Sequence, residues 1–318
     1  MTSQGAILQS AGTNSCAIIV PCGSRKKVKP STSASAVNLP ILPQIELETA
    51  WQNLLSEMPI ATEVASLYSG RGFHLAKRAA EATKAPLYVI SAGLGLVSAA
   101  RKVPTYGLTV AGRGPETISC RVSDTFNASA WWNSVSQGPY ATPLQSVFFA
   151  TSDAPVLIAL SQPYARMMSS ALDRLTDDQI ARLRIVGVKL ERILSRRVRP
   201  QILPYDERLD GALPGTQSDF PQRAIFHFVS KCLRSAPTET VDGHRQMVSD
   251  VLADSVAPKR DKRPKVSDQD ILHLIRRHLK ADQGIGRLLR LIRDQDRVAC
   301  EQARFSRLYR QAVESRMS

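Results

Sequence analysis

The chain has 318 residues, enough for one large α/β domain and a smaller module, and its five cysteines form no CxxC pair, which argues against a disulfide framework or a zinc site. No apolar run approaches the roughly 18 residues needed to cross a bilayer, so we expect a soluble, cytoplasmic protein without membrane contact, and nothing indicates a metal or other cofactor. The 42 Lys and Arg residues against 28 Asp and Glu give a net charge of +14, which favours a polyanionic partner such as DNA.

The first half of the chain alternates short apolar runs with helical patterns. Residues 1–14 are small and polar and are predicted to be disordered, and "CAIIVPC" then predicts a buried strand. Apolar spacing at 46–58 and 62–83 predicts helices. "PLYVIS" (86–91) and "PVLIALS" (155–161) predict two further buried strands, and an amphipathic helix follows the second.

The second half of this domain continues the alternation. "LRIVGV" (183–188) and "PQILPY" (200–205) predict two more strands, separated by the helical pattern "KLERILSRR", and a further helix begins near Pro221. Strands that alternate with helices favour a mostly parallel sheet covered on both faces. We therefore expect an α/β three-layer sandwich over residues 15–234.

The C-terminal part differs in composition. Residues 235–266 predict a basic linker, and residues 267–318 predict a helical module of three short helices, with Ser267 as a helix N-cap. Residues 259–318 carry 16 Lys and Arg against 8 Asp and Glu. The pattern resembles a helix-turn-helix, in which Arg304 and Arg307 on the last helix would contact DNA. The alternative is a helical cap packed on the sheet domain.

Glycines follow the second predicted strand in "VISAGLGLVS". Gly93, Gly95 and Ser98 approximate the GxGxxG fingerprint, but Pro104 interrupts the helix that a dinucleotide site requires, so we do not expect a nicotinamide site. These glycines either allow a sharp turn or let backbone N–H groups approach a ligand at the sheet edge.

A basic loop, "CGSRKK", follows the first predicted strand at the same edge. If the strands are parallel, its backbone amides and the side chains of Ser24, Arg25, Lys26 and Lys27 are placed to contact phosphate. The GxxxxGK[ST] pattern of a P-loop is absent. A solvated basic turn is the alternative interpretation.

Several motifs in order resemble a known family. "IIVPCGSRKK", "LYSGRGFHLAKRAAE", "YVISAGLGLV", "PTYGLTV" and "VLIALSQPYARMMSSAL" are similar to the CGxxK, LYxGxxF, SAxxGL and YDxT motifs, and the later strand-helix segment, of a bacterial family of unknown-function domains. That family is grouped with the uracil-DNA-glycosylase-like fold, and some members resemble anti-phage DNA glycosylases that remove modified bases. The match covers residue 16 to about residue 172. Gly107 stands where the family has Asp, so a carboxylate must come from elsewhere.

The resemblance implies a pocket for a base flipped out of DNA. Such a pocket needs an aromatic wall, for which Tyr68, Phe73 and Tyr106 are the candidates. It also needs hydrogen-bond donors to the departing base, for which the backbone from Ser91 through Gly93 to Gly95 is the candidate.

Cleavage of an N-glycosidic bond also needs a carboxylate for the sugar or the water. Asp206, Glu207 and Asp219 lie in a loop after the last predicted strand, and loops often carry sites. Asp219 is alternatively a helix cap. Arg223 and His227 share a helix face and could reach a phosphate, although a histidine between phenylalanines is more often packed in the core.

The charge favours a DNA-binding protein, and the resemblance implies a DNA glycosylase that excises a modified base from invading phage DNA. Two alternatives remain open: a non-catalytic DNA-binding defence or regulatory subunit, and a nucleoside or nucleotide N-glycosidic hydrolase or deoxyribosyltransferase. Zinc deaminase and serine hydrolase motifs are absent.

Overall fold

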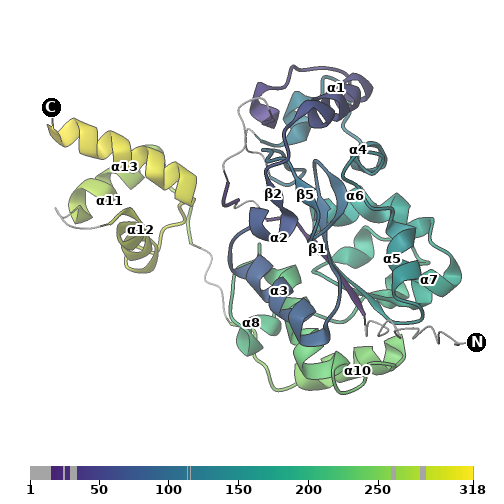
Figure 1. The fold of residues 1–318 in the computed structure, drawn as a ribbon. Helices are drawn as coiled ribbons and strands as arrows, with labels where there is room; N and C mark the ends of the chain where they lie inside the picture. The colour runs from purple at the N-terminus through teal and green to yellow at the C-terminus, as the bar shows by residue number, and fades with distance from the viewer. Residues whose placement is uncertain are drawn as a thin grey trace, which may run out of the picture. The chain divides into compact units, whose positions relative to one another are not determined.

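The structure is a computed structural model that describes residues 16–23, 26–28, 34–112, 114, 116–258, 263–279 and 284–317. It divides between Pro258 and Lys259 into two compact units, which we call the α/β unit and the helical module (Figure 1). The predicted disordered segment 1–14 and the loop residues Ser24 and Arg25 lie outside the described residues. None of the described helices is long and apolar enough to cross a membrane.

The α/β unit is built on a five-stranded sheet in the order β4-β3-β1-β6-β7. β1 pairs in parallel with β3 and β6, β7 pairs in parallel with β6, and only β4 is antiparallel. Nearly every residue of these strands is buried, as expected for a parallel sheet covered on both faces. The predicted mostly parallel α/β sheet is confirmed. Its strands are β1 (Ala17–Pro21), β3 (Leu87–Ser91), β4 (Gly95–Ser98), β6 (Val156–Ala159) and β7 (Leu183–Val186).

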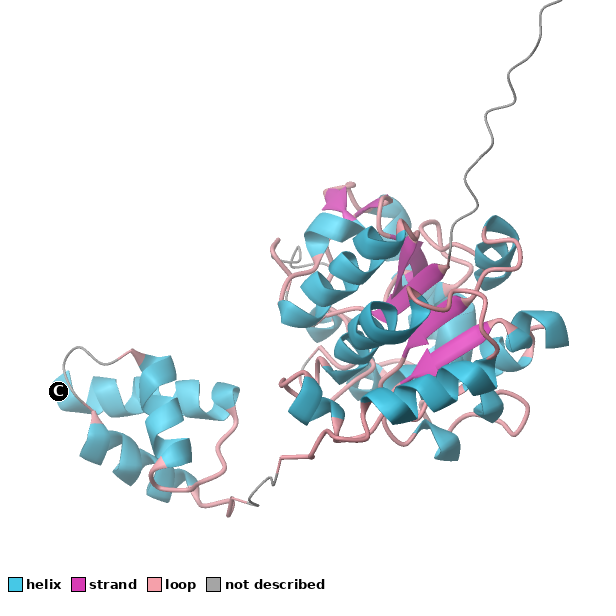
Figure 2. Cartoon of the chain, turned by 90° about the horizontal axis from the view of Figure 1, so that it is seen from below, coloured by secondary structure: helices cyan, strands magenta, loops and turns pink. Residues whose placement is uncertain are grey.

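Helices cover both faces of this sheet (Figures 1 and 2). α3 (Arg71–Thr83) and α9 (Phe220–Phe228) pack together against the strands, and α4 (Ala128–Val135) packs with α6 (Gln162–Asp173). The chain moves in opposite directions across the sheet from β1 to β3 and from β6 to β7, so right-handed crossovers place α3 and α6 on opposite faces. The layers are therefore helix, sheet and helix.

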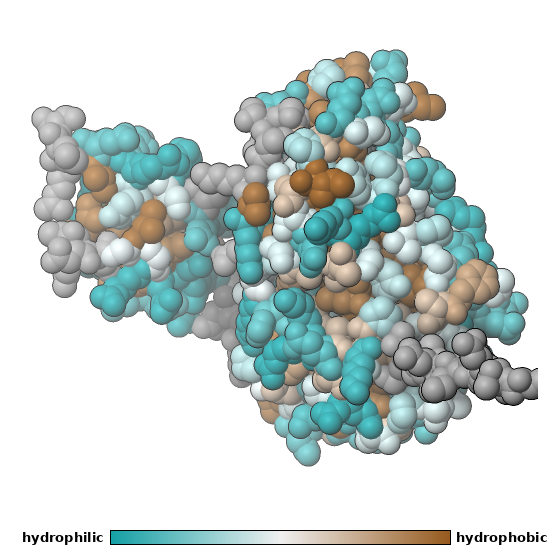
Figure 3. Space-filling model, in the orientation of Figure 1, coloured by the Kyte–Doolittle hydropathy of each residue, from teal (hydrophilic) through white to brown (hydrophobic). Residues whose placement is uncertain are grey.

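Further helices, a small sheet and turns complete the α/β unit. The main apolar core contains the three tryptophans, all buried, and the visible surface is mostly hydrophilic with smaller hydrophobic patches (Figure 3). The remaining elements are α1 (Gln44–Glu57), α2 (Val64–Leu67), α5 (Leu144–Ala150), α7 (Asp177–Ala181), α8 (Leu209–Ala212), α10 (Val241–Val251), a small sheet of β2 (Thr62–Glu63) and β5 (Lys102–Val103), 3₁₀ turns at Ala36–Asn38, Ile118–Arg121, Leu190–Arg192 and Arg199–Gln201, and a π-helical turn at Val229–Leu233.

Three predicted elements differ from the structure. The predicted strand at 200–205 is wrong: Pro200 and Pro204 have no N–H to donate, and the segment forms a 3₁₀ turn with a single parallel bridge between Ile202 and Ile185. The predicted helix at 62–83 is interrupted before α3, where Gly70 has a φ of 102°. The helical pattern after β7 yields only a short 3₁₀ turn.

The stretch with Gly93 and Gly95 forms a hairpin between β3 and β4. Ser91 pairs with Gly95 across the turn, and Gly95 has a φ of 77°, which favours glycine. A Cβ at Gly93 would lie 2.9 Å from the rings of Trp51 and Tyr106. The turn and the close packing therefore explain why glycine occupies both positions. β3 is followed by β4 rather than by a phosphate-binding helix.

The boundary between the units lies within the predicted linker, but the α/β unit extends beyond its predicted end at residue 234. Residues 235–266 were expected to be a linker, but Val241–Val251 form α10, in which His244 and Val248 are buried within the α/β unit. The helical module has its own core around Ile275, Ile292 and Phe305. Its helices are α11 (Asp268–His278), α12 (Ile285–Asp294) and α13 (Gln302–Met317). Ser267 caps α11 as predicted, through a capping box with Asp270.

Candidate active site at the carboxyl edge of the sheet

The order of the strands defines where a ligand fits best. The chain leaves β1 toward β3 on one side and leaves β6 toward β7 on the other, so the order reverses between the neighbouring strands β1 and β6. In open α/β sheets, ligands bind at the carboxyl ends of the strands beside such a point. Cys22 follows β1 there, Ser91 ends β3, and Tyr164 lies in the first turn of α6.

Three of the predicted pocket residues form one buried chain of hydroxyl groups. The Tyr106 hydroxyl lies 2.8 Å from the Tyr68 hydroxyl and 2.6 Å from Ser91 Oγ. Ser91 Oγ also accepts hydrogen bonds from the backbone N–H groups of Gly93 (3.3 Å) and Leu94 (2.9 Å). Burial raises the pKa of both tyrosines well above the ordinary value, so the hydroxyls are neutral.

Cys22 and Tyr164 extend this cluster and were missed by sequence reasoning. Cys22 Sγ lies 2.9 Å from the Tyr164 hydroxyl, whose pKa burial also raises. Lys26 Nζ lies 4.3 Å above the centre of the Tyr106 ring. Burial lowers the pKa of Lys26, against the attraction of Cys22 and Glu116. The position of Cys22 directly after a buried strand is the signal that could have identified it.

The structure brings together the six predicted base-pocket residues. Tyr68, Phe73, Ser91 and Tyr106 meet through their side chains, and Gly93 and Gly95 lie in the hairpin next to Ser91. Phe73 meets the Tyr68 ring edge-on at 5.5 Å, and both tyrosine rings are buried. Of the backbone donors predicted for the base, the N–H groups of Gly93 and Leu94 are occupied by Ser91 Oγ, and the Gly93 carbonyl accepts a hydrogen bond from Trp51 Nε1 (2.7 Å). A stacking role for these rings stays a prediction.

Asp219 and Arg223 form a buried ion-pair network rather than a free acid and a phosphate contact. Arg223 is 0% exposed, and its Nε lies 2.8 Å from Asp219 Oδ1 while its Nη2 lies 2.8 Å from Asp210 Oδ1. Arg223 also donates to the carbonyls of Leu213 (2.6 Å) and Thr216 (2.8 Å). Arg223 therefore cannot reach a phosphate, and this prediction is wrong.

Asp219 occupies the N-cap position of α9 but makes no side-chain capping bond, since it accepts from the Thr216 N–H (2.9 Å) and from Arg223. It lies beside Gly72 at the start of α3. His227 is also buried, with Nδ1 2.9 Å from the Tyr205 hydroxyl, in agreement with core packing.

Asp206 and Glu207 are more accessible. Because Ile202 bridges Ile185 in parallel, the chain reaches Asp206 at the same carboxyl edge. Burial opposes ionisation of Asp206, but hydrogen bonds from the Arg208 side chain (3.0 Å) and backbone (2.9 Å) outweigh it, and the pKa of Asp206 lies below its ordinary value. Glu207 is exposed, and its side chain has no partner among the described residues.

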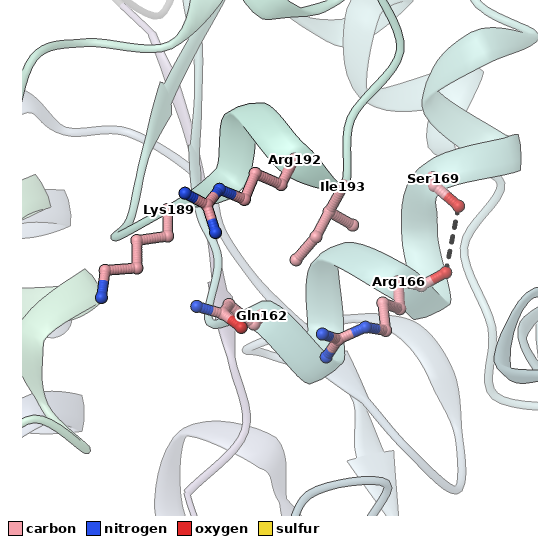
Figure 4. A pocket seen from close by; sticks show the side chains of 6 residues that line it. All are labelled: Gln162, Arg166, Ser169, Lys189, Arg192 and Ile193. Carbon is pink, nitrogen blue, oxygen red and sulfur yellow. Dashed lines mark hydrogen bonds between the residues drawn. The ribbon is translucent and has the colours of Figure 1, made fainter.

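A second part of this edge, over β6 and β7, holds a pocket of about 510 Å³ (Figure 4). It is lined by Gln162, Arg166, Ser169, Lys189, Arg192 and Ile193. Sequence reasoning missed this pocket, although "SQPYAR" and "GVKLER" each follow a predicted parallel strand and therefore meet at one edge.

The predicted DNA contacts on α13 are engaged inside the helical module. Arg304 and Arg307 each lie 2.6 Å from the carboxylate of Asp268, in the first turn of α11. These hydrogen bonds with two arginines lower the pKa of Asp268. On α12, by contrast, Arg287 and Arg290 are exposed and have no side-chain partner within the described part of the chain.

Comparisons with known proteins do not assign the chain to a family. No family model matches the chain, and neither a curated protein nor a solved structure is significantly similar to it. Within the described residues, no cluster of His, Cys, Asp and Glu side chains could hold a metal ion.

Proposed function

We propose that the α/β unit hydrolyses the N-glycosidic bond of a base in DNA, and that the helical module contributes affinity for DNA. The observation that carries the proposal is the convergence, at the carboxyl edge of one parallel sheet, of a hydroxyl cluster, an accessible carboxylate loop and a cationic pocket. The assignment to the uracil-DNA-glycosylase-like fold belongs to this proposal. The modified base and its origin in phage DNA rest on the motif resemblance alone.

The reaction needs two kinds of group. Water attacks the sugar carbon, the carbon–nitrogen bond breaks, and its electron pair leaves on the base, which then takes up a proton. A carboxylate accepts the proton of the water and stabilises the positive charge on the sugar. Hydrogen-bond donors stabilise the base as it leaves. Lys26 is one donor placed at this edge, and a second is whichever of Tyr164 and Cys22 accepts the hydrogen bond between them and so keeps its own hydrogen free.

The contacts rank the three candidate carboxylates. The buried guanidinium of Arg223 neutralises Asp219, so the Asp219 carboxylate would contribute little to stabilising a positive charge on the sugar. Asp206 is held ionised but is paired with Arg208, whereas the side chain of Glu207 is exposed and has no described partner. We therefore favour Glu207, with Asp206 second. Asp219 serves to hold α9 and its preceding loop in place.

One observation favours the non-catalytic alternative. The position at which the resembling family has Asp is Gly107, and its backbone N–H and carbonyl are bonded to Ala34 and Ala36. The chain therefore lacks that carboxylate, and Asp219 is not free to replace it. A DNA-binding subunit would keep the basic surfaces without needing Glu207.

The test is incubation of the purified protein with plain DNA and with phage DNA carrying modified cytosines, followed by alkaline cleavage and mass spectrometry of released bases. We expect a free base and abasic sites, with the rate reduced at least about 100-fold in Glu207→Gln. Asp219→Asn, in contrast, should act through stability. Binding without any base release would favour the DNA-binding subunit. Release from small nucleosides after deletion of residues 259–318 would favour a nucleoside hydrolase.

The helix that faces DNA in the module is a further part of the proposal. Arg287 and Arg290 lie three residues apart on the exposed face of α12, where they can contact phosphates. Apart from the adjoining chain, no described atom lies within 4 Å of a Cβ built at Gly284 or Gly286, at the start of α12, so a nucleic-acid backbone could approach closely there. We therefore place the DNA contact on α12 rather than on α13.

A further inference from the structure

The pocket over β6 and β7 is formed by two segments that follow parallel strands. Gln162 and Arg166 come from the first turns of α6, directly after β6, and Lys189 and Arg192 come from the loop and 3₁₀ turn after β7. Figure 4 shows the Arg192 guanidinium and the Gln162 amide pointing into the same space, with Ile193 between Arg192 and Arg166. Its position beside β6 places it next to the reversal of the strand order.

The close contact between these two segments depends on a glycine. A Cβ at Gly187 would lie 2.1 Å from the Leu160 carbonyl oxygen, so no larger residue fits where the loop after β7 crosses the end of β6. Lys189 then adopts the left-handed conformation, with a φ of 59°, which is uncommon for a residue with a side chain. The backbone thus brings together the two segments that carry Arg166, Lys189 and Arg192 around one pocket.

The cationic side chains of this pocket have no ion-pair partner among the residues that the structure describes. Arg166, Lys189 and Arg192 are exposed, no acidic residue lines the pocket, and no carboxylate in the described part of the chain pairs with them. A pocket of about 530 Å³ in the helical module provides the contrast. There, Arg263 pairs with Asp294, Arg293 donates to the Cys300 carbonyl, and Arg304 pairs with Asp268.

Like charges gathered without counter-charges repel one another, so their arrangement favours an anion. Arginine presents a planar fork of N–H groups that matches phosphate oxygens, and Gln162 and Ser169 add neutral polar groups. Gln162 is also the first residue of α6, a twelve-residue helix whose first-turn N–H groups lack helical acceptors and favour negative charge.

We propose that this pocket binds a phosphate group of the nucleic-acid substrate. The inference rests on the proposed function for the identity of the substrate, and it names the group by which the α/β unit would hold that substrate beside the reacting sugar. The phosphate could be an internal backbone diester or a terminal phosphate. Both present the same tetrahedral oxygen anion to the arginines, and the experiment separates them.

The experiment is isothermal titration calorimetry of the full chain with three probes: a deoxynucleoside 5′-monophosphate, the corresponding deoxynucleoside, and a short oligonucleotide without a terminal phosphate. The variants are Arg192→Gln and Arg166→Gln. The matched control is Arg174→Gln at the other end of α6, where an exposed arginine bonds to Asn133 and lies about 12 Å away along the helix axis. All three remove one positive charge.

We expect the monophosphate to bind and the nucleoside to bind more weakly, with Arg192→Gln reducing monophosphate affinity about tenfold and Arg174→Gln leaving it unchanged. An equal reduction for the unphosphorylated oligonucleotide would indicate a backbone diester, and no reduction for that probe would indicate a terminal phosphate. Equal affinities in Arg192→Gln, Arg166→Gln and Arg174→Gln would overturn the proposal. Thermal denaturation checks that the exposed substitutions leave the fold intact.

The same variants separate this inference from the proposed function. Phosphate binding that depends on Arg192, without base release from any DNA, would leave the pocket assigned and the glycosylase proposal contradicted. Base release that is unaffected by Arg166→Gln and Arg192→Gln would support the glycosylase and contradict the pocket. Each result therefore bears on one proposal without depending on the other.

Discussion

The cluster over β1 and β3 and the pocket over β6 and β7 lie on the same edge of one sheet. They differ in the burial and in the hydrogen bonding of their polar groups. In the first, the hydroxyls of Tyr68, Ser91 and Tyr106 are buried and bond to one another. In the second, Arg166 and Arg192 are exposed and have no partner among the described residues. Satisfied buried groups rigidify a structure, whereas unpaired exposed cations remain available to a ligand.

This difference separates residues that stabilise the site from residues that are available to bind a ligand. Buried, paired groups should affect stability strongly when changed, and exposed, unpaired cations should affect binding while leaving stability nearly unchanged. We expect the same distinction in the buried ion-pair network, in the hydroxyl cluster and in the helical module.

The largest effect is expected for Arg223→Gln. This change leaves the buried Asp210 and the largely buried Asp219 without their shared counter-charge, which should lower the free energy of unfolding by about 3–5 kcal/mol. Urea denaturation followed by tryptophan fluorescence measures it, because the three tryptophans of the chain all lie in the α/β unit. The fluorescence signal therefore reports on that unit alone.

Arg208→Gln is the control for this prediction, because it removes an arginine from a partly exposed pair with Asp206. It should cost less than about 1 kcal/mol. Similar losses in the two variants would show that burial of the Arg223 network does not determine its contribution.

A smaller effect is expected for Tyr106→Phe. The change removes the hydroxyl that bonds to Tyr68 and Ser91 and leaves those buried groups with fewer partners, so the free energy of unfolding should fall by about 1–3 kcal/mol. Tyr88→Phe, at a half-buried tyrosine with no described side-chain hydrogen bond, should change it by less than about 0.5 kcal/mol. Phosphate affinity should be unchanged in both variants. A tenfold loss of phosphate affinity in Tyr106→Phe would place the cluster in ligand binding.

Much of the sheet could be predicted from the sequence because its strands are short, apolar runs bounded by turn signals. The alternation with helices then predicts parallel pairing, and with it the proximity of the loops after β1, β3 and β6. The β3–β4 hairpin was missed because a glycine-rich turn after a strand fits either a helix or another strand. The strand at 200–205 was predicted from its apolar residues, although its two prolines argue against ladder pairing.

The partners of charged residues could not be predicted in this way. Asp210, Asp219 and Arg223 are close in sequence, but only the fold of the loop before α9 shows that both carboxylates meet one buried guanidinium. Likewise, Asp268 pairs with Arg304 and Arg307 from more than thirty residues away. Helical periodicity identified the exposed face of α13, but it contains no information about which arginines another helix engages.

The smallest effect on stability is expected in the helical module, where DNA binding should change instead. The comparison is between the exposed arginines of α12 and the paired arginines of α13. The double variant Arg287→Gln/Arg290→Gln should leave the fold of the module intact, because both side chains are exposed and have no described partner. If each arginine neutralises one phosphate, the slope of log K against log salt for duplex DNA should become shallower by about 1.8. Fluorescence anisotropy with a labelled duplex at several salt concentrations measures that slope.

The double variant Arg304→Gln/Arg307→Gln is the matched control, since it removes the same charge from the two arginines that Asp268 engages. Each lost pair is partly exposed and should cost no more than about 1 kcal/mol, so the module should remain folded, which circular dichroism can verify. Its salt slope should stay close to that of the unchanged chain, because a guanidinium held by a carboxylate releases few counterions from DNA. A shallower slope in this variant alone would mean that DNA displaces Asp268, and that α13 rather than α12 makes the contact.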